Sequence, residues 1–273
     1  MKVAVVGHVE WVEFARVEHV PAPGEIVHAL ETWEEPAGGG AVAAVQLANL
    51  NGSALLFTSL GNDELGVRAR RELEARGVSV YATRAREPQR RALTHVDDRG
   101  ERAITVLGRK VPPSGEDGSL PWETLARCDA VYFASGDIAS LRAARRAPVL
   151  VATARVLSTL ARSGVEIDVL VGSGEDADER FEPGALEPPP RIVVTTAGAL
   201  GGWIRPGGPF RAAPVPGPLV DAYGCGDCFA AGVTYALGEG RPVDEAVGLG
   251  ARCGAAVLTG RGAYAGQLTA ATL

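Results

Sequence analysis

The feature that most limits the fold is a regular alternation of apolar runs and helical stretches in the second half of the chain. Such alternation is typical of parallel strands, because a parallel connection must cross back along the sheet, usually through a helix. A further buried strand is expected at residues 2–6, KVAVV. The chain is therefore predicted to be an α/β protein with a mostly parallel central sheet and helices on both faces. The apolar runs lie near 129–134, 148–152, 167–171 and 191–196.

Two segments do not fit this parallel pattern. Residues 10–35 alternate apolar and polar side chains and are interrupted by prolines and a glycine, as in a solvent-facing hairpin. Residues 90–108 hold two short runs joined by Asp98-Arg99-Gly100, which also favours a hairpin. The two segments are predicted to form one small sheet outside the main one. Residues 1–273 are then a single domain with this appendage.

Composition argues against several classes of partner. The 27 basic and 33 acidic residues give a net charge of -6, and no basic stripe predicts a nucleic-acid surface. No uninterrupted apolar stretch is long enough to span a bilayer, and the N-terminus lacks the pattern of a signal peptide. Four irregularly spaced cysteines do not suggest a secreted disulfide framework. We therefore expect a cytoplasmic protein with no nucleic-acid or membrane partner.

The most informative segment is Asp221-Ala-Tyr-Gly-Cys-Gly-Asp227, which leads into a helical stretch expected at about 226–238. Glycines let backbone amides approach a ligand, and a helix N-terminus attracts anions through its unpaired N–H groups. These donors are expected to favour the ionised form of Asp227. Such a carboxylate could accept a proton from a hydroxyl while the amides hold a transferring phosphoryl group. The alternative is that Asp227 only caps the helix.

Three segments together resemble the signatures of the ribokinase-like (pfkB) carbohydrate kinase family. Residues 221–227 are similar to its C-terminal signature, D-T-x-G-A-G-D. Residues 38–66 are similar to its N-terminal signature, in which a diglycine and an Ala-rich helix precede a strand and G-x-D-x-x-G. Residues 196–201, TAGALG, resemble its T-x-G-x-x-G nucleotide loop. The resemblance implies a sheet of about nine strands, a β lid formed by about 10–35 and 90–108, and ATP with Mg²⁺ as cofactors.

The resemblance also implies roles for individual residues in phosphoryl transfer. Asp227 would be the base for a hydroxyl of a small sugar, sugar acid or nucleoside. The amides of the turn that precedes it would form the anion hole, and four further positions would line the nucleotide. The anion-hole residues implied are Gly224, Cys225 and Gly226, and the nucleotide-lining residues are Thr196, Gly198, Gly201 and Gly254.

Ion sites are implied in the same way. Asp221 matches a family position near a monovalent cation, which makes activation by K⁺ an expectation. Ser173-Gly-Glu-Asp176 stands where the family carries N-x-x-E, a motif that organises Mg²⁺-bound water and phosphate. A hydroxyl and a shorter carboxylate can still hold metal-bound water, and Glu175 is an alternative.

The substrate end departs from the family pattern. Glu10 and Val12 stand where ribokinases carry Asn and Asp, and Ala43 replaces a further Asn. Losing two hydroxyl-binding groups should weaken selection of ribose, because such sites discriminate by paired hydrogen bonds. The acceptor therefore stays open. The candidate substrate-binding residues are Glu10, Val12, Gly38, Gly39, Ala43 and Asp137.

Alternatives to an active kinase can be formulated. The chain could be a catalytically weak relative that binds a metabolite or nucleotide and acts as a regulator. An oxidoreductase is disfavoured, because Gly-His-Val-Glu rather than G-x-G-x-x-G follows the first strand. Cys225 and Cys228 form a C-x-x-C at a helix start, a position that lowers thiol pKa and can support redox chemistry. Finally, the small sheet could pair two copies into a homodimer.

Overall fold

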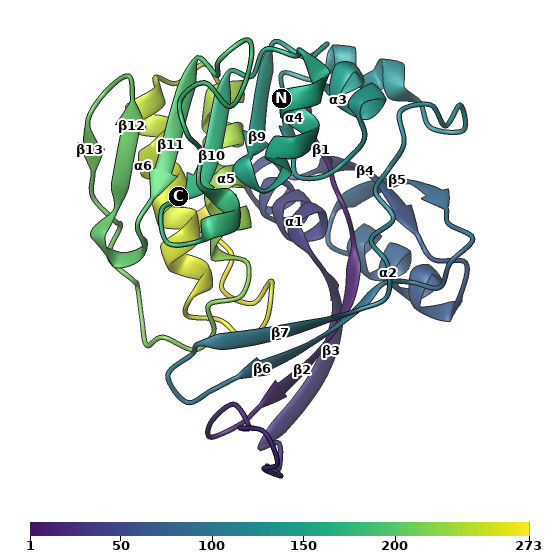
Figure 1. The fold of residues 1–273 in the computed structure, drawn as a ribbon, viewed down its shortest axis with the longest axis vertical. Coiled ribbons are helices and arrows are strands. Elements are labelled where there is room, and N and C mark those ends of the chain that lie inside the picture. The colour runs from purple at the N-terminus through teal and green to yellow at the C-terminus, as the bar shows by residue number, and fades with distance from the viewer. Residues whose placement is uncertain (273) are drawn as a thin grey trace.

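The computed structural model describes residues 1–272, and its central element is a sheet of nine strands (Figure 1). The strands are β1 (Val3–Val6), β4 (Ala54–Leu60), β5 (Val78–Arg84), β8 (Ala130–Phe133), β9 (Val149–Thr153), β10 (Val169–Ser173), β11 (Ile192–Thr196), β12 (Gly202–Arg205) and β13 (Pro209–Phe210). Their order is β13-β12-β11-β10-β9-β8-β1-β4-β5. The pairs β11–β12 and β12–β13 are antiparallel, and all the other neighbouring pairs are parallel. The prediction of a mostly parallel sheet is confirmed. The sequence pattern did not predict β5, β12 or β13.

Helices cover both faces of this sheet, as predicted. The side chains of β1 alternate between two hydrophobic clusters: Val3 and Val5 face one, and Ala4 and Val6 face the other. This alternation follows from the two-residue period of a strand. The first face carries α1 (Gly39–Asn51), α2 (Glu64–Glu74), α5 (Cys225–Gly238) and α6 (Val243–Val257), and the second carries α3 (Ile138–Ala144) and α4 (Leu157–Ser163).

Helix α1 begins directly against the end of β1. A Cβ atom on Gly40 would lie 2.6 Å from the carbonyl carbon of Gly7, so only glycine allows this approach. The Gly40 amide also donates to the His8 carbonyl at 3.1 Å. The helix ends at Gly52, whose φ of 83° is left-handed, as expected for a glycine stop. The close approach brings Gly38 and Gly39 to the carboxyl edge of the sheet.

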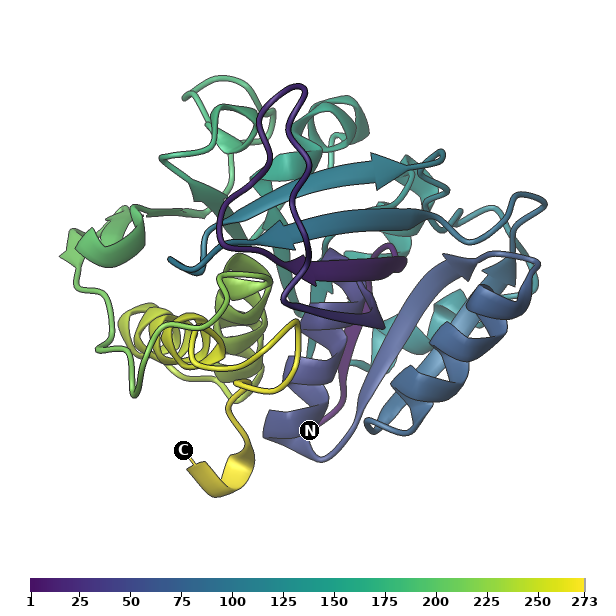
Figure 2. The same ribbon diagram turned by 90° about the horizontal axis from the view of Figure 1, so that it is seen from below.

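A second sheet of four strands, which we call the lid, lies across that edge (Figures 1 and 2). It consists of β2 (Glu10–Arg16), β3 (Glu31–Ala37), β6 (Arg91–Val96) and β7 (Arg102–Leu107) in the order β3-β2-β6-β7. The prediction of one small separate sheet from these segments is confirmed. The tip of the β6–β7 hairpin contacts the body, because the Ala222 amide donates to the Gly100 carbonyl at 3.1 Å.

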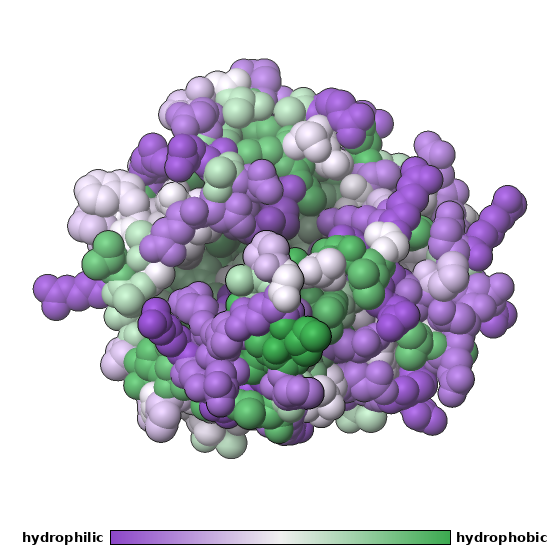
Figure 3. Space-filling view, turned by 60° about the horizontal axis from the view of Figure 1, so that its bottom comes forward, coloured by the Kyte–Doolittle hydropathy of each residue, from purple (hydrophilic) through white to green (hydrophobic). Residues whose placement is uncertain are grey.

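The lid exposes apolar side chains, and Figure 3 shows hydrophobic side chains gathered on the face that carries it. Ile26 in the β2–β3 loop is 87% exposed, and Ile104 and Val106 on β7 are 45% and 43% exposed. This surface agrees with the prediction of a homodimer through the lid, which stays a prediction. Separately, none of the helices within residues 1–272 is both long enough and apolar enough to cross a bilayer.

Candidate active site

The N-terminus of α5 presents unpaired amides at the carboxyl edge of the sheet. Gly224 precedes the helix with a left-handed φ of 77°, and its carbonyl accepts the first helical bond, from the Cys228 amide at 2.9 Å. Within residues 1–272, no backbone carbonyl accepts a hydrogen bond from the amides of Cys225, Gly226 or Asp227. A helix start with free N–H groups is suited to hold an anion. The anion-hole prediction therefore has the required geometry and stays a prediction.

The Asp227 side chain lies against Gly39 at the start of α1. A Cβ atom on Gly39 would lie 2.8 Å from Asp227 Oδ1. On the same helix, Val42 packs against Gly224, where an added Cβ would lie 2.8 Å from Val42 Cγ1. The segments that resemble the two family signatures are thus in direct contact, although 188 positions separate Gly39 from Asp227 in the sequence.

Burial raises the pKa of Asp227 to about 6, and the negative charge of Glu179 adds to this shift, whereas Arg155 and Arg102 oppose it. The expectation that the helix amides favour the ionised form is therefore wrong in its net effect. Loss of water around the carboxylate is the largest cause of the shift. A base is most effective when its pKa lies near the working pH, so the raised value suits proton transfer.

The residues expected to line the nucleotide gather beside α5. Thr196 ends β11, and its hydroxyl donates to the Gly172 carbonyl at 3.3 Å. Gly198 faces Glu175, since an added Cβ would lie 3.2 Å from Glu175 Oε1. Gly254 on α6 lies against the start of α5, where an added Cβ would be 3.1 Å from the Cys225 carbonyl oxygen. The left-handed φ of Gly201, 93°, turns the chain from β11 into β12. Their contacts with a nucleotide stay predictions.

The segment after β10 is a compact turn. The Ser173 hydroxyl accepts from the amides of Glu175 at 3.1 Å and Asp176 at 3.3 Å. Asp176 pairs with Arg155 at 2.6 Å, and Glu179 pairs with the same guanidinium. Neither Arg155 nor Glu179 was predicted from the sequence, because neither belongs to a recognisable motif.

Residues 177–179 form a single 3-10 turn. Within residues 1–272, no group of three or more His, Cys, Asp or Glu side chains is arranged to hold a metal ion. Mg²⁺ commonly retains several waters and binds through one or two carboxylates and substrate phosphates, so Ser173 and Asp176 are compatible with such a site.

Asp221 joins the C-terminal signature to the end of the chain. Its two carboxylate oxygens accept from the amides of Tyr223 at 2.8 Å and Gly262 at 3.0 Å. Burial raises the pKa of Asp221, against the effect of these two hydrogen bonds. The Tyr223 hydroxyl in turn accepts from the Gly38 amide at 3.3 Å, which ties the two signatures together. The role of Asp221 near a monovalent cation is not tested and stays a prediction.

The candidate substrate residues divide into two groups. Val12 and Ala43 are completely buried in the hydrophobic core, so neither offers a polar group to a hydroxyl. Glu10 is 6% exposed and pairs with Arg90 at 3.0 Å, so it is a buried charge beside the diglycine rather than an exposed one at the lid edge. Gly38 and Gly39 lie between Glu10 and Asp227.

Asp137 has a structural role at the start of α3. One carboxylate oxygen accepts from the amides of Ser140 at 2.7 Å and Gly115 at 3.0 Å, and the other accepts from the Ser114 hydroxyl at 2.6 Å. We expect Asp137→Ala to lower the free energy of unfolding by about 1–2 kcal/mol, because it removes a helix cap. Asp137→Asn, which preserves capping, should lose less. Thermal melts and steady-state kinetics test this, and a selective rise in acceptor KM with both variants would instead support a substrate contact.

The cysteines do not have the environment of a redox pair. Burial raises the pKa of both the Cys225 and Cys228 thiols, and Cys228 is completely buried. The expectation that the helix start lowers thiol pKa is therefore wrong here, because loss of water around each thiol is the largest cause of its shift. All four cysteines are free.

Comparisons with known proteins agree with this geometry. Residues 1–173 and 166–270 match the pfkB family carbohydrate kinases. The chain is 30% identical to an ATP-dependent ribose-1-phosphate kinase of Halopiger xanaduensis, over 93% of this chain and 91% of that protein.

Solved structures show the same fold. Ribokinase from Thermotoga maritima superposes with a TM-score of 0.80 at 22% identity, covering 100% of this chain and 97% of that one. Arabidopsis thaliana ribokinase, complexed with ribose and ATP, gives 0.74 at 19% identity, covering 99% and 96%. The two signatures meet in space, and the lid lies over the carboxyl edge of the sheet. Because the family model also matches nearly the whole chain, this chain belongs to the pfkB family of carbohydrate kinases.

Proposed function

We propose that this carbohydrate kinase transfers the γ-phosphoryl group of ATP to a hydroxyl of a small sugar-type acceptor, with Asp227 as the base. The observation that carries this proposal is the position of the Asp227 carboxylate beside amides that have no backbone acceptor. The similarity to an ATP-dependent kinase supports ATP as the donor. A hydroxyl that lies over the Gly39 backbone would meet the carboxylate directly, since no Cβ intervenes.

The proposed reaction is an in-line displacement. The acceptor oxygen forms a bond to the γ-phosphorus, while the bond from that phosphorus to the β,γ-bridging oxygen breaks and ADP leaves. Asp227 accepts the proton of the attacking hydroxyl, and the amides of Cys225, Gly226 and Asp227 stabilise the negative charge on the transferring group. Mg²⁺, held by the ATP phosphates and by water near Ser173 and Asp176, would neutralise charge on the nucleotide.

An ADP-release assay against a panel of acceptors tests this proposal. The panel should contain ribose, ribose 1-phosphate, a sugar acid such as ribonate, and adenosine. We expect ADP release with at least one of these acceptors, and we expect Asp227→Asn to abolish that release. A catalytically weak regulator is the alternative, favoured by the engagement of Asp176 with Arg155. Thermal stabilisation by ATP or an acceptor without ADP release would support the regulator.

The pKa of Asp227 predicts the acid limb of the pH profile. The base must be deprotonated, and its pKa is raised to about 6, so activity is gained as the pH rises through this value. Below about pH 6, kcat/KM for the acceptor should fall about tenfold per pH unit. A pH–rate profile between pH 4.5 and 8 measures this limb. A profile that is flat across this range, recorded in buffers that keep the protein folded, would contradict the assignment of the base.

A further inference from the structure

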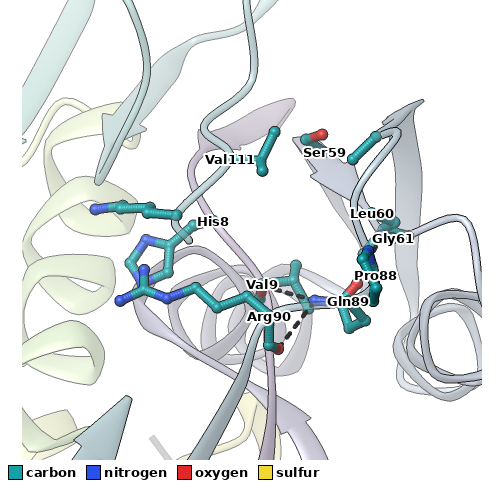
Figure 4. A pocket seen from close by; sticks show the side chains of 11 residues that line it. His8, Val9, Ser59, Leu60, Gly61, Pro88, Gln89, Arg90 and Val111 are labelled. Carbon is teal, nitrogen blue, oxygen red and sulfur yellow. Dashed lines mark hydrogen bonds between the residues drawn. The ribbon is translucent and has the colours of Figure 1, made fainter. Parts of the chain in front are cut away.

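A pocket opens beside the end of β1, near the place where the lid joins the body. Its polar lining includes His8, Arg90 and Lys110, together with Ser59 and Gln89. Figure 4 shows the His8 ring and the Arg90 side chain side by side, both pointing away from Ser59. Three nitrogen-bearing side chains from different segments thus converge where the lid meets the body. The mechanism proposed above uses none of them.

Positive charge in this pocket exceeds the negative charge that faces it. Arg90 pairs with Glu10 at 3.0 Å. The Lys110 ammonium forms no ion pair or hydrogen bond with any residue in 1–272. Among the carboxylates, Glu10 has the largest electrostatic effect on the pKa of Lys110. By contrast, the nearby Arg155 is paired with two carboxylates. Two partly buried cations therefore face one carboxylate, Glu10, and the charge of Asp227 acts only more weakly on Lys110.

Two buried polar atoms in the same cluster have no partner. Arg90 Nε and His8 Nδ1 are shielded from solvent and form no hydrogen bond. An unsatisfied buried polar group lowers stability, so native proteins rarely leave one without a ligand or water to complete it. Burial lowers the pKa of His8 well below its usual value, and Lys110 and Arg90 add to the shift, so the imidazole is neutral. Its two nitrogens can therefore donate one hydrogen bond and accept another.

The diglycine connects this cluster to the base. A Cβ atom on Gly38 would lie 3.1 Å from His8 Cδ2 and 3.3 Å from Glu10 Cγ. A Cβ atom on the next residue, Gly39, would lie 2.8 Å from Asp227 Oδ1. Two consecutive residues therefore span from the cationic cluster to the catalytic carboxylate. A small acceptor that lies along them would present a hydroxyl to Asp227 at one end and reach the cluster with the other.

Other segments hold Arg90 in this position. The adjacent Gln89 donates through its side chain to the Val9 carbonyl at 2.9 Å (Figure 4), and its backbone amide donates to Asp63 at 3.0 Å. Asp63 also caps α2 by accepting from the Gly66 amide at 3.0 Å. The G-x-D segment of the N-terminal signature thus fixes the backbone that carries Arg90. Such preorganisation is typical of a binding site rather than of a mobile surface charge.

We propose that Arg90 and Lys110 bind a phosphate group carried by the acceptor, so that the substrate is a phosphorylated sugar rather than a neutral one. This inference deepens the proposed function and rests on it. A phosphomonoester offers three oxygens and nearly two negative charges, which match a guanidinium fork and an ammonium. A neutral sugar would leave one of these two positive charges uncompensated, because Glu10 pairs only with Arg90. The 30% identity to an ATP-dependent ribose-1-phosphate kinase agrees with this class of acceptor.

The test compares ribose 1-phosphate with ribose in Arg90→Gln and Lys110→Gln. Each variant should lower kcat/KM for ribose 1-phosphate by about 10- to 150-fold, the value of one charged hydrogen bond, with little change for ribose. Arg91→Gln is the matched control: this neighbouring residue on β6 is exposed and pairs with Glu13, so both activities should persist. Equal losses for ribose and ribose 1-phosphate would overturn the proposal, as would a higher kcat/KM for ribonate than for ribose 1-phosphate in the unchanged protein.

A binding measurement separates this proposal from the proposed function. Calorimetric titration of ribose 1-phosphate into Asp227→Asn should show binding that is lost when Arg90→Gln is added. If the unchanged protein turns over none of the acceptors and this pattern still holds, the phosphate site stands while the kinase assignment fails. Binding that is unaffected by Arg90→Gln refutes the phosphate site. Circular dichroism checks each fold, and Lys110→Gln decides the matter if Arg90→Gln does not fold.

Discussion

Replacement of Asp227 by Asn is expected to reduce turnover by at least about 10²-fold, because the amide cannot accept the acceptor proton. Nucleotide binding should persist, since the free amides at the start of α5 belong to the backbone. The measurements are ADP release at saturating ATP and the affinity for ATP by calorimetry. Near-native turnover in the variant would show that Asp227 is not the base.

The same replacement should stabilise the fold at neutral pH. The folded-state pKa of Asp227 is raised to about 6 from 3.8, so burial disfavours the ionised form. The unfavourable contribution is fully present above about pH 6 and is relieved as the pH falls from 6 towards 3.8. Removing the charge should therefore raise the free energy of unfolding at pH 7 by about 1–3 kcal/mol, an upper range because the side chain is only partly buried.

Asp244→Asn is the matched control for this replacement. Asp244 is an exposed residue in the first turn of α6, where its charge interacts with the helix dipole. Its loss should lower stability by about 0.3–1 kcal/mol and leave turnover unchanged. Opposite changes in stability, with loss of activity only for Asp227→Asn, would identify a carboxylate retained for chemistry at a cost in stability. Destabilisation by Asp227→Asn would instead indicate a cap that supports the helix.

Replacement of Gly39 by Ala should have the second large effect. The added methyl group would lie 2.8 Å from Asp227 Oδ1, closer than van der Waals contact allows. It would therefore displace the carboxylate and occupy the space through which a hydroxyl approaches. A misplacement of about 1 Å can cost about 10²-fold in rate, and we expect a loss of that size in kcat/KM.

Gly248→Ala distinguishes this effect from a general consequence of replacing a helical glycine. Gly248 lies in α6, and an added Cβ would meet no atom within 4 Å. This replacement should stabilise the protein by about 0.5–1 kcal/mol and keep full activity. Thermal melts and kinetics on both variants provide the comparison. Full activity in Gly39→Ala would mean that the diglycine does not shape the acceptor site.

The main parallel strands and the lid could be predicted because their side chains follow short periods along the chain. Strand β1 is a continuous apolar run, and β6 and β7 flank a hairpin turn. Two of the missed strands lack this signal: β12 begins with glycine, and β13 is only two residues long and begins with proline. They exist because β11 offers an edge for pairing. That edge is a property of the folded sheet.

The candidate base and its glycines could also be predicted, since a glycine-rich turn before an apolar helix is visible in the chain as Gly224-Cys-Gly-Asp227. The charges around it could not. Arg90, Lys110 and Arg155 are separated in the sequence and carry no motif, and Arg90 looks no different from its exposed neighbour Arg91. Arg90 and Arg91 are distinguished only by their surroundings in the folded protein, where Arg90 pairs with the buried Glu10 and Arg91 pairs with the more exposed Glu13.

The sequence by itself therefore determined the class of fold, the signatures and the identity of the candidate base, because these depend on local periodicity and on glycines at set positions. Tertiary structure alone decided the raised pKa of Asp227, the meeting of Arg90 and Lys110 in one pocket, and the pairing of Arg90 with Glu10. The physical reason is that burial and electrostatic interaction depend on distances in space. Those distances are set by long-range packing of the lid on the sheet.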